Sequence, residues 1–228
     1  MPALTPAMGS SVPAIGLFGG TFDPIHYGHL RAALETKEQL GLDDFRLLPA
    51  GTPALRTSTF ASAAHRMAML QLAVADYSGF SVDDREIRRS GKSYMVDTLL
   101  EIRKESGSTP LLLVIGQDAA NQLDSWHRWR SIFSLAHLVV MQRPESAIEW
   151  RSELRETIED RLIDSDAPLR DRPAGCVLPL TVTQLAISST GIRTLLSHGR
   201  SARYLLPDAV LEYIERNKLY FAAQPSKG

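Results

Sequence analysis

The stretch AIGLFGGTFDPIHYGHLR, residues Ala14 to Arg31, sets the direction of the fold. It begins with five apolar residues that predict a buried strand. Gly19 and Gly20 then permit a tight turn and a close approach of a ligand to the backbone. His26 precedes a segment with helical spacing, and His29 falls in the first turn of that helix. The stretch therefore predicts a strand, a glycine turn and a helix in that order.

The rest of the chain continues this alternation of apolar runs and helical patterns. Leu111 to Ile115 is the clearest buried strand, and Ser62 is a favoured N-cap residue before another helical pattern. Strands that alternate with helices predict a parallel sheet covered on both faces. Further strands are expected at residues 45–49, 80–82, 137–141 and 177–182, and further helices at 93–104, 125–133, 149–162, 189–197 and 207–217.

The domain organisation follows from the same pattern. No internal repeat and no glycine- and serine-rich linker interrupts residues 14–221, so we expect one domain that includes the C-terminal helices. Residues 1–13, rich in Pro, Ser and Ala, and residues 222–228 are expected to be flexible tails. Residues 165–175, rich in Pro, Asp and Arg, are expected to form a loop.

Composition excludes several functional classes. The 228 residues are 44% hydrophobic and carry a formal net charge of -1, so no basic field favours nucleic acid. No apolar run approaches the roughly 20 residues of a membrane span, and the N-terminus lacks the features of a secretory signal. The single cysteine, Cys176, cannot form an intrachain disulfide, which fits a cytoplasmic location. The sequence leaves a homo-oligomer open.

In an open parallel sheet, ligands bind beyond the carboxyl ends of the strands. That rule selects residues 21–29, 49–56, 116–118, 142–144 and 187–193. Gly91-Lys92-Ser93 resembles the end of a phosphate-binding P-loop, but Glu86 stands where that motif requires glycine. The glycines from Gly16 to Gly20 likewise lack the spacing of a dinucleotide site.

The two histidines suit a phosphate site at this rim. A helix N-terminus offers free N–H groups and partial positive charge, and Gly28 removes a side chain that would block a ligand. Imidazoles donate hydrogen bonds to phosphate oxygens without carrying a permanent charge. Histidines that merely cap a helix, and a metal site, are the alternatives. No cysteine pair and no H-E-x-x-H motif supports the metal site.

The segment ISSTGIR, Ile187 to Arg193, is a second candidate for phosphate binding. Ser188, Ser189 and Thr190 are residue types that cap helices, and Arg193 lies about one turn further on. Hydroxyls, backbone N–H groups and a guanidinium would converge on one phosphate chain. The alternative is an ordinary capped helix with a surface arginine.

Together these two motifs resemble the H-x-G-H adenylyltransferases of the nucleotidyltransferase superfamily. Segments SAAHRMAML (62–70), GKSYMVDTL (91–99), IGQDAANQLDSW (115–126) and YLLPDAVLEYIERNKLY (204–220) resemble bacterial nicotinate-nucleotide adenylyltransferases in particular. The likeness runs from about Ile15 to Tyr220. It implies a Rossmann-like, doubly wound α/β fold of nucleotidyltransferase type.

The resemblance also implies a reaction in NAD biosynthesis. Nicotinate mononucleotide would attack the α-phosphorus of ATP, with Mg²⁺ assisting, and give nicotinate adenine dinucleotide and pyrophosphate. His26, His29 and Arg193 would be catalytic, and no protein metal ligand is implied. ATP would be bound by Gly19, Gly20, Thr21, Phe22, His26, Gly28, His29, Arg56, Ile187, Ser188, Ser189, Thr190 and Arg193. The mononucleotide would contact Asp23, Tyr94, Met95, Gly116, Asp118, Trp126 and Arg143.

Several of these roles have structural alternatives. Tyr94 and Trp126 could be core aromatics, and Asp118 could be an N-cap. His65 and Arg66 match the family but are expected to be structural, and His127, Trp129 and His137 are expected to be packing or surface residues.

The chain departs from the family at two places. Leu55 replaces the usual histidine before a basic position that Arg56 retains, and Met95 replaces the usual threonine after Ser-Tyr. These changes affect substrate preference more than the class of reaction. The rival functions are adenylation of nicotinamide mononucleotide or phosphopantetheine, and a nucleotide-binding regulator that has lost catalysis. Retention of both His26 and His29 argues against the regulator.

Overall fold

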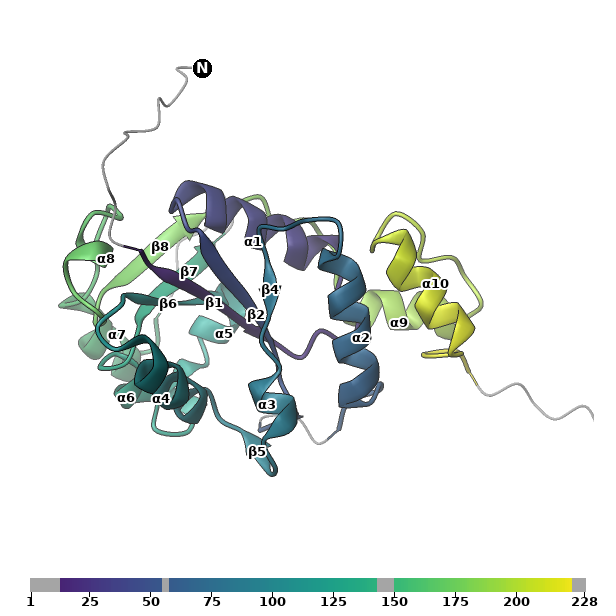
Figure 1. Ribbon diagram of the computed structural model, residues 1–228, viewed down its shortest axis with the longest axis horizontal. Helices are drawn as coiled ribbons and strands as arrows, with labels where there is room; N and C mark the ends of the chain where they lie inside the picture. The colour runs from purple at the N-terminus through teal and green to yellow at the C-terminus, as the bar shows by residue number, and fades with distance from the viewer. Residues whose placement is uncertain (1–12, 55–57, 143–149, 223–228) are drawn as a thin grey trace, which may run out of the picture.

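A six-stranded, wholly parallel sheet forms the centre of the protein (Figure 1). The computed structural model describes residues 13–54, 58–142 and 150–222. The strand order is β4-β2-β1-β6-β7-β8, so the chain winds outward from β1 first to one side and then to the other. The strands are β1 (Ile15–Gly20), β2 (Asp44–Pro49), β4 (Ser81–Val82), β6 (Leu111–Gly116), β7 (His137–Gln142) and β8 (Val177–Thr181). The expected doubly wound parallel fold is confirmed.

Alternate residues of the central strands point to opposite faces of the sheet. Leu111, Leu113 and Ile115 of β6 belong to one buried cluster, whereas Leu112 and Val114 belong to the other. This period of two explains why these strands read as continuous apolar runs, because both faces are covered. The sheet therefore has two cores, one under each layer of helices.

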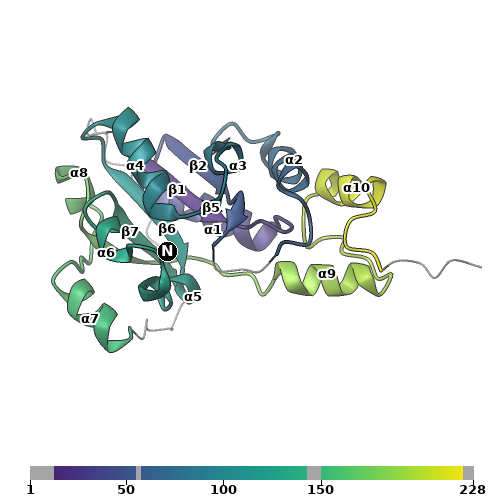
Figure 2. The ribbon, with the colours of Figure 1, turned by 90° about the horizontal axis from the view of Figure 1, so that it is seen from below.

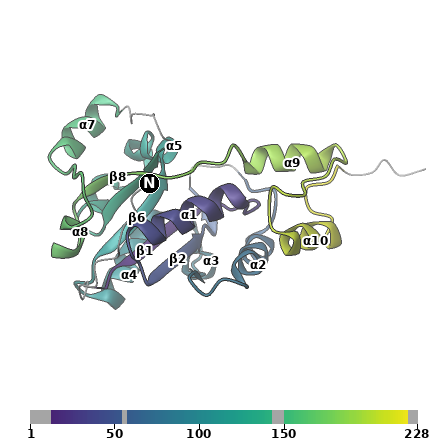
Figure 3. The same cartoon turned by 90° about the horizontal axis from the view of Figure 1, so that it is seen from above.

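The helices divide between the two faces (Figures 2 and 3). One core includes side chains of α1 (Tyr27–Gln39), α2 (Ala63–Val74) and α8 (Pro168–Asp171). The other includes side chains of α4 (Met95–Ser106), α5 (Gln117–Ala120), α6 (Trp129–Ile132) and α7 (Ser152–Glu159). The C-terminal helices α9 (Ser189–Ser197) and α10 (Asp208–Arg216) lie beside α2, away from the body of the sheet.

Short elements complete the rim of the sheet. A two-stranded parallel ribbon joins β3 (Thr52–Pro53) to β5 (Lys92–Ser93), and α3 (Arg85–Arg88) lies between them in the sequence. Gly51 makes this arrangement possible, since a Cβ there would lie 2.2 Å from the Glu86 carbonyl oxygen. The chain can therefore bring residues 51–54 and 85–95 together at the carboxyl ends of the strands.

Three expectations about elements need correction. The helix expected at 125–133 is broken, because Arg128 adopts a left-handed conformation (φ 52°) between the 3-10 turn η1 (Leu123–Ser125) and α6. The helix expected at 149–162 is shorter and spans only Ser152–Glu159. The expected loop at 165–175 contains α8, which begins at Pro168.

No helix within the described ranges is long and apolar enough to cross a membrane. Residues 1–12 and 223–228 lie outside those ranges, so the two expected tails, and the single-domain boundaries, stay predictions.

Candidate active site

The first motif forms the turn between β1 and α1. His26 is the N-cap of α1 in extended conformation, and His29 lies in the first turn, as expected. Their rings stack with centroids 3.7 Å apart and planes at 24°. A Cβ on Gly28 would lie 3.0 Å from the His26 ring and 3.3 Å from the Ile187 carbonyl oxygen. Glycine here therefore lets the histidine turn meet the start of the second motif.

Burial keeps both imidazoles neutral. Desolvation lowers the pKa of His26 to about 4. It lowers the pKa of His29 well below its ordinary value, and the neighbouring His26 lowers it further. The Nδ1 atoms of both rings are buried without a hydrogen-bond partner among the described residues. A neutral imidazole has one donor and one acceptor, so the pair can still bind a ligand.

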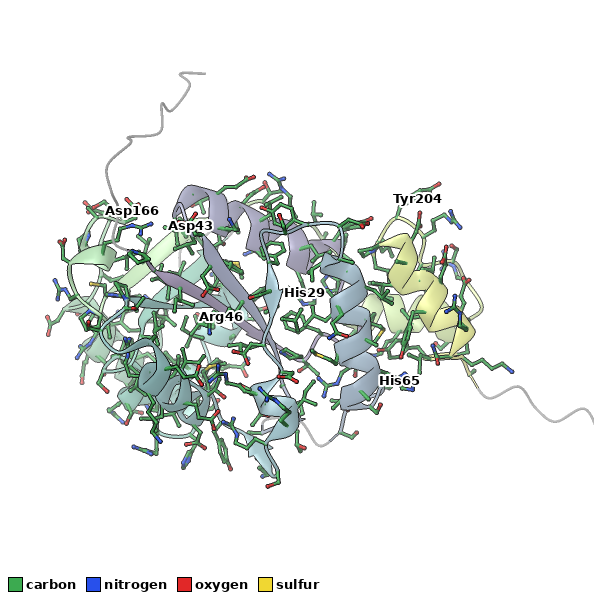
Figure 4. The ribbon with its side chains drawn as sticks, in the orientation of Figure 1. His29, Asp43, Arg46, His65, Asp166 and Tyr204 are labelled. Carbon is green, nitrogen blue, oxygen red and sulfur yellow. The ribbon has the colours of Figure 1, made fainter. Side chains whose placement is uncertain are left out.

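The Phe22 ring packs against the His29 ring. Its side chain is buried, its backbone φ is 48°, and its ring meets the His29 ring edge-on at a centroid distance of 5.2 Å. Figure 4 shows His29 on the inner side of α2 and His65 on the outer side, toward the C-terminal helices. His65 Nδ1 lies 2.9 Å from the Tyr213 hydroxyl, which links α2 to α10. His29 and His65 therefore have different surroundings.

The second motif docks directly onto the first. Ser188 caps α9, its hydroxyl accepting from the Gly191 N–H at 3.0 Å. Ser189 donates to the Pro24 carbonyl oxygen at 2.9 Å, and Arg193 donates to the Asp23 carbonyl oxygen at 2.6 Å. Two segments that lie far apart in the sequence thus form one surface, at the carboxyl end of β1.

Arg193 is fixed on three sides. Besides its bond to Asp23, it donates to the Thr190 hydroxyl at 3.0 Å, and its guanidinium lies 4.2 Å above the centre of the Phe60 ring. Phe60 is 74% exposed, whereas Arg193 beneath its ring is 9% exposed. The Arg193 Nε is buried without a hydrogen-bond partner among the described residues. The guanidinium is positioned in advance for a further acceptor.

Asp23 is placed behind the turn and not at its free surface. It is 2% exposed, and its carboxylate accepts from the Phe60 N–H (2.7 Å), the Ala61 N–H (3.1 Å) and the Tyr220 hydroxyl (2.7 Å). Burial and the bond to Asp23 raise the pKa of Tyr220. The expected direct contact between Asp23 and a substrate stays untested, but the structure shows it as an organiser of the loops.

Arg66 organises the other side of the turn. It is fully buried and donates to the carbonyl oxygens of Thr21 and Gly51, both at 2.8 Å. It therefore ties the end of β1 to the segment after β2. This position agrees with the structural role expected for it.

A cavity of about 410 Å³ lies next to the switch point between β1 and β6. From this point the chain adds β2 and β4 on one side and β7 and β8 on the other. Open α/β sheets bind ligands where the strand order reverses in this way. Of the predicted site residues, it brings together Gly19, Gly20, Thr21, Tyr94, Met95 and Trp126. Its lining also includes Leu48, Ala50, Pro53, Ala54, Glu86, Ser93, Ile115, Ser125 and His127.

Other predicted residues lie away from this cavity or cannot be placed. Asp118 is exposed on α5 and does not line the cavity, and Gly116 faces open space at the N-cap of α5. Arg56 and Arg143 lie outside the described residues, so their roles stay predictions.

Glu86, Ser93, Ser125 and His127 line the cavity but were not among the predicted site residues. The rule about carboxyl ends, applied to the short strand β4, would have included Glu86, which follows it by four residues. The sequence held no comparable signal for His127. It reaches the cavity only because the helix expected at 125–133 is broken.

Protein side chains in the described ranges form no cluster of three or more His, Cys, Asp or Glu residues that could hold a metal ion. Ser188 and Ser189 are committed to bonds within the protein. The site therefore offers hydrogen-bond donors and a guanidinium, which suit phosphate groups.

Comparisons with known proteins identify the family. The family model described as "Cytidylyltransferase-like" matches residues 17–195. A Methylococcus capsulatus protein named "Probable nicotinate-nucleotide adenylyltransferase" is 54% identical over 90% of this chain and 99% of its own length. A Pseudomonas entomophila protein of the same name is 47% identical over 93% of this chain and 97% of its own length.

A solved structure agrees on the fold. Nicotinic acid mononucleotide adenylyltransferase of Plasmodium falciparum, complexed with NaAD, has a TM-score of 0.71 at 15% identity and covers 91% of this chain and 97% of that chain. At this identity the likeness concerns the fold alone. The sequence relatives carry the assignment further: the chain belongs to the cytidylyltransferase-like family and, within it, to the nicotinate-nucleotide adenylyltransferases.

Proposed function

We propose that this enzyme condenses ATP with nicotinate mononucleotide to give nicotinate adenine dinucleotide and pyrophosphate, a step of NAD biosynthesis. The observation that carries the proposal is the docking of the second motif on the first. Three hydrogen-bonding groups, His26, His29 and Arg193, are thereby brought together at the turn that follows Gly19, Gly20 and Thr21, and these three residues line the cavity. Residues of these types can stabilise charge on a phosphate chain.

The reaction needs positioning more than covalent chemistry. The phosphate oxygen of the mononucleotide attacks the α-phosphorus of ATP, the bond from that phosphorus to the bridging oxygen breaks, and pyrophosphate leaves with the electron pair. Negative charge grows on the phosphate chain, where imidazole N–H groups and the Arg193 guanidinium can donate to it. The committed hydroxyls of Ser188 and Ser189 are consistent with direct transfer without an enzyme-bound intermediate.

Mg²⁺ would enter this reaction bound to ATP. The described residues offer it no ready set of carboxylates, whereas the triphosphate itself supplies hard oxygen ligands. Bound there, it would neutralise charge on the phosphates and on the leaving group. The surrounding protein groups then orient the phosphate chain by hydrogen bonds.

The cavity suits the acceptor nucleotide. Tyr94 and Trp126 line it and can pack against a pyridine ring, and the glycines of β1 leave its wall open to the phosphate groups. Asp118, Arg56 and Arg143 are proposed as further contacts from the same rim. A reaction that consumes ATP, and a lone buried thiol at Cys176, support a cytoplasmic location.

Product analysis tests the proposal. The protein is incubated with ATP, Mg²⁺ and one acceptor, which is nicotinate mononucleotide, nicotinamide mononucleotide or phosphopantetheine, and the adenylylated product is separated and identified. We expect nicotinate adenine dinucleotide as the preferred product. A preference for another acceptor would move the substrate assignment, and ATP binding without any product would indicate a regulator.

A further inference from the structure

An aromatic ring outside both cores covers the guanidinium of Arg193. Phe60 is largely exposed and belongs to neither buried cluster, whereas Arg193 is buried. The Arg193 Cζ lies 4.2 Å from the centre of the Phe60 ring. An apolar side chain stabilises a fold by leaving water, and most of this ring stays in water. The packing of the fold therefore gives little reason for a phenylalanine at this position.

One buried residue, Asp23, holds both partners of this contact. Its carboxylate accepts from the Phe60 N–H at 2.7 Å, and its backbone carbonyl oxygen accepts from Arg193 at 2.6 Å. The N–H of the next residue, Ala61, donates to the same carboxylate at 3.1 Å, and Ala61 is buried. The position of the Phe60 backbone thus depends on hydrogen bonds that a change of the ring does not remove.

The ring leaves the hydrogen-bonding capacity of the guanidinium intact. Arg193 uses one terminal nitrogen for the Asp23 carbonyl oxygen and the other for the Thr190 hydroxyl, and its Nε is buried without a partner among the described residues. An aromatic face attracts a guanidinium through the ring quadrupole and accepts no N–H bond in the guanidinium plane. The ring can therefore restrict the orientation of the cation while N–H groups remain available to a ligand.

We infer that Phe60 is a positioning residue for Arg193: its ring orients the guanidinium and shields it from water, so that the remaining N–H groups meet the phosphate chain of ATP. This inference rests on the role that the proposed function gives to Arg193. A charge that is partly withdrawn from water interacts more strongly with a phosphate and needs less reorganisation during the reaction. Phe60 itself need not touch the substrate.

Steady-state kinetics of Phe60→Ala test the inference. We expect kcat/KM for ATP to fall about tenfold, with KM for the mononucleotide unchanged within about twofold. The remaining kcat/KM for ATP should depend more steeply on ionic strength, because salt screens an exposed charge more than a covered one. The urea midpoint should stay at the wild-type value, since the ring lies outside both cores.

Two substitutions at the same position separate the aromatic face from simple apolar cover. Phe60→Trp keeps a face that attracts cations and should retain wild-type kinetics, whereas Phe60→Leu covers the guanidinium without a π system and should recover only part of the loss. Tyr204→Ala is the matched control, because Tyr204 is an exposed aromatic residue on the loop between α9 and α10. It should leave kcat/KM for ATP unchanged.

Calorimetric titration with inorganic triphosphate gives a readout that needs no acceptor. Phe60→Ala should bind triphosphate about threefold or more weakly, and Phe60→Trp should bind it as the wild type does. The inference is overturned if Phe60→Ala keeps the wild-type kcat/KM for ATP, if it raises the KM of both substrates equally, or if Phe60→Leu matches Phe60→Trp. A wild-type preference for another acceptor would contradict the proposed function alone, because the same series with that acceptor, and the triphosphate titration, still decide the role of Phe60.

Discussion

The proposed site has a phosphate half and an acceptor half, which are built in opposite ways. His26 and Arg193 are buried, and His29 has a buried Nδ1. The two histidine rings stack on each other, and Arg193 of α9 donates to the Asp23 carbonyl oxygen in the β1–α1 turn. Tyr94, Trp126 and His127 line the cavity from short elements and remain partly or fully exposed. The phosphate half is thus fixed in advance, which is what electrostatic stabilisation of a transition state requires. The acceptor half presents aromatic rings that are partly open to solvent, and Trp126 among them also packs against the core.

The largest effect should come from His29→Ala. We expect kcat to fall about 10²–10³-fold, as for removal of one preorganised donor, with a much smaller change in ATP binding. Single-turnover rates and ATP titrations measure the two quantities separately. His198→Ala is the matched control, because His198 is an exposed histidine at the end of α9. Wild-type turnover in His29→Ala would remove this residue from the mechanism.

Substitutions that remove hydrogen bonds between the loops of the phosphate half should also destabilise the folded protein. Asp23→Asn replaces an acceptor of three hydrogen bonds by a group that also donates, so we expect a loss of about 3 kcal/mol in the free energy of unfolding. Tyr220→Phe removes only one of the three bonds and should cost about 1 kcal/mol. Urea unfolding measures both. Equal losses from the two variants would mean that Asp23 does not organise these loops.

Acid should destabilise the folded protein through the two buried histidines of the phosphate half. The folded pKa of His26 is about 4, below its ordinary value of 6.5, and that of His29 is lowered too. The unfolded chain therefore binds more protons between these values, so stability is full above pH 6.5 and is lost as pH falls toward about 4. His26→Gln should flatten this part of the profile. An unchanged slope in the unfolding free energy would show that His26 does not stay neutral.

The smallest effect on activity is expected from a helix cap that lies outside both halves. The Ser62 hydroxyl accepts from the His65 N–H at 3.3 Å at the start of α2. Ser62→Ala should cost about 1 kcal/mol in unfolding free energy and leave the kinetic constants unchanged. Thermal unfolding and steady-state kinetics give both readouts. A large loss of activity would extend the phosphate half to this helix.

The sequence predicted most of the phosphate half because its signals are local. Apolar residues, glycines, a helix start and capping hydroxyls are read from neighbours in the chain, and His26, His29 and Ser188 lie where those signals put them. The relative position of the two motifs could be expected only from the rule about carboxyl ends. The buried role of Asp23 could not be predicted, because the groups that donate to its carboxylate come from the distant residues 60, 61 and 220.

The acceptor half was harder to predict for a physical reason. Nothing in SWHRWR, residues 125–130, breaks a helix, since the segment has neither Gly nor Pro. Tertiary packing overrides the local preference, because Trp129 and Ile132 are buried under the sheet while Arg128 takes a left-handed conformation. His127 and Glu86 therefore line the same cavity only in the folded protein.

The central claim is that the phosphate half accelerates transfer and the acceptor half selects the acceptor. It is tested most directly by the ratio of kcat/KM for the acid and the amide acceptor in His29→Ala. The measurement compares kcat/KM for nicotinate and nicotinamide mononucleotide in this variant with the wild-type values. If the phosphate half only accelerates transfer, both constants fall by the same factor and their ratio is preserved. A ratio that changes tenfold or more would contradict this account, because the histidine pair would then take part in choosing the acceptor.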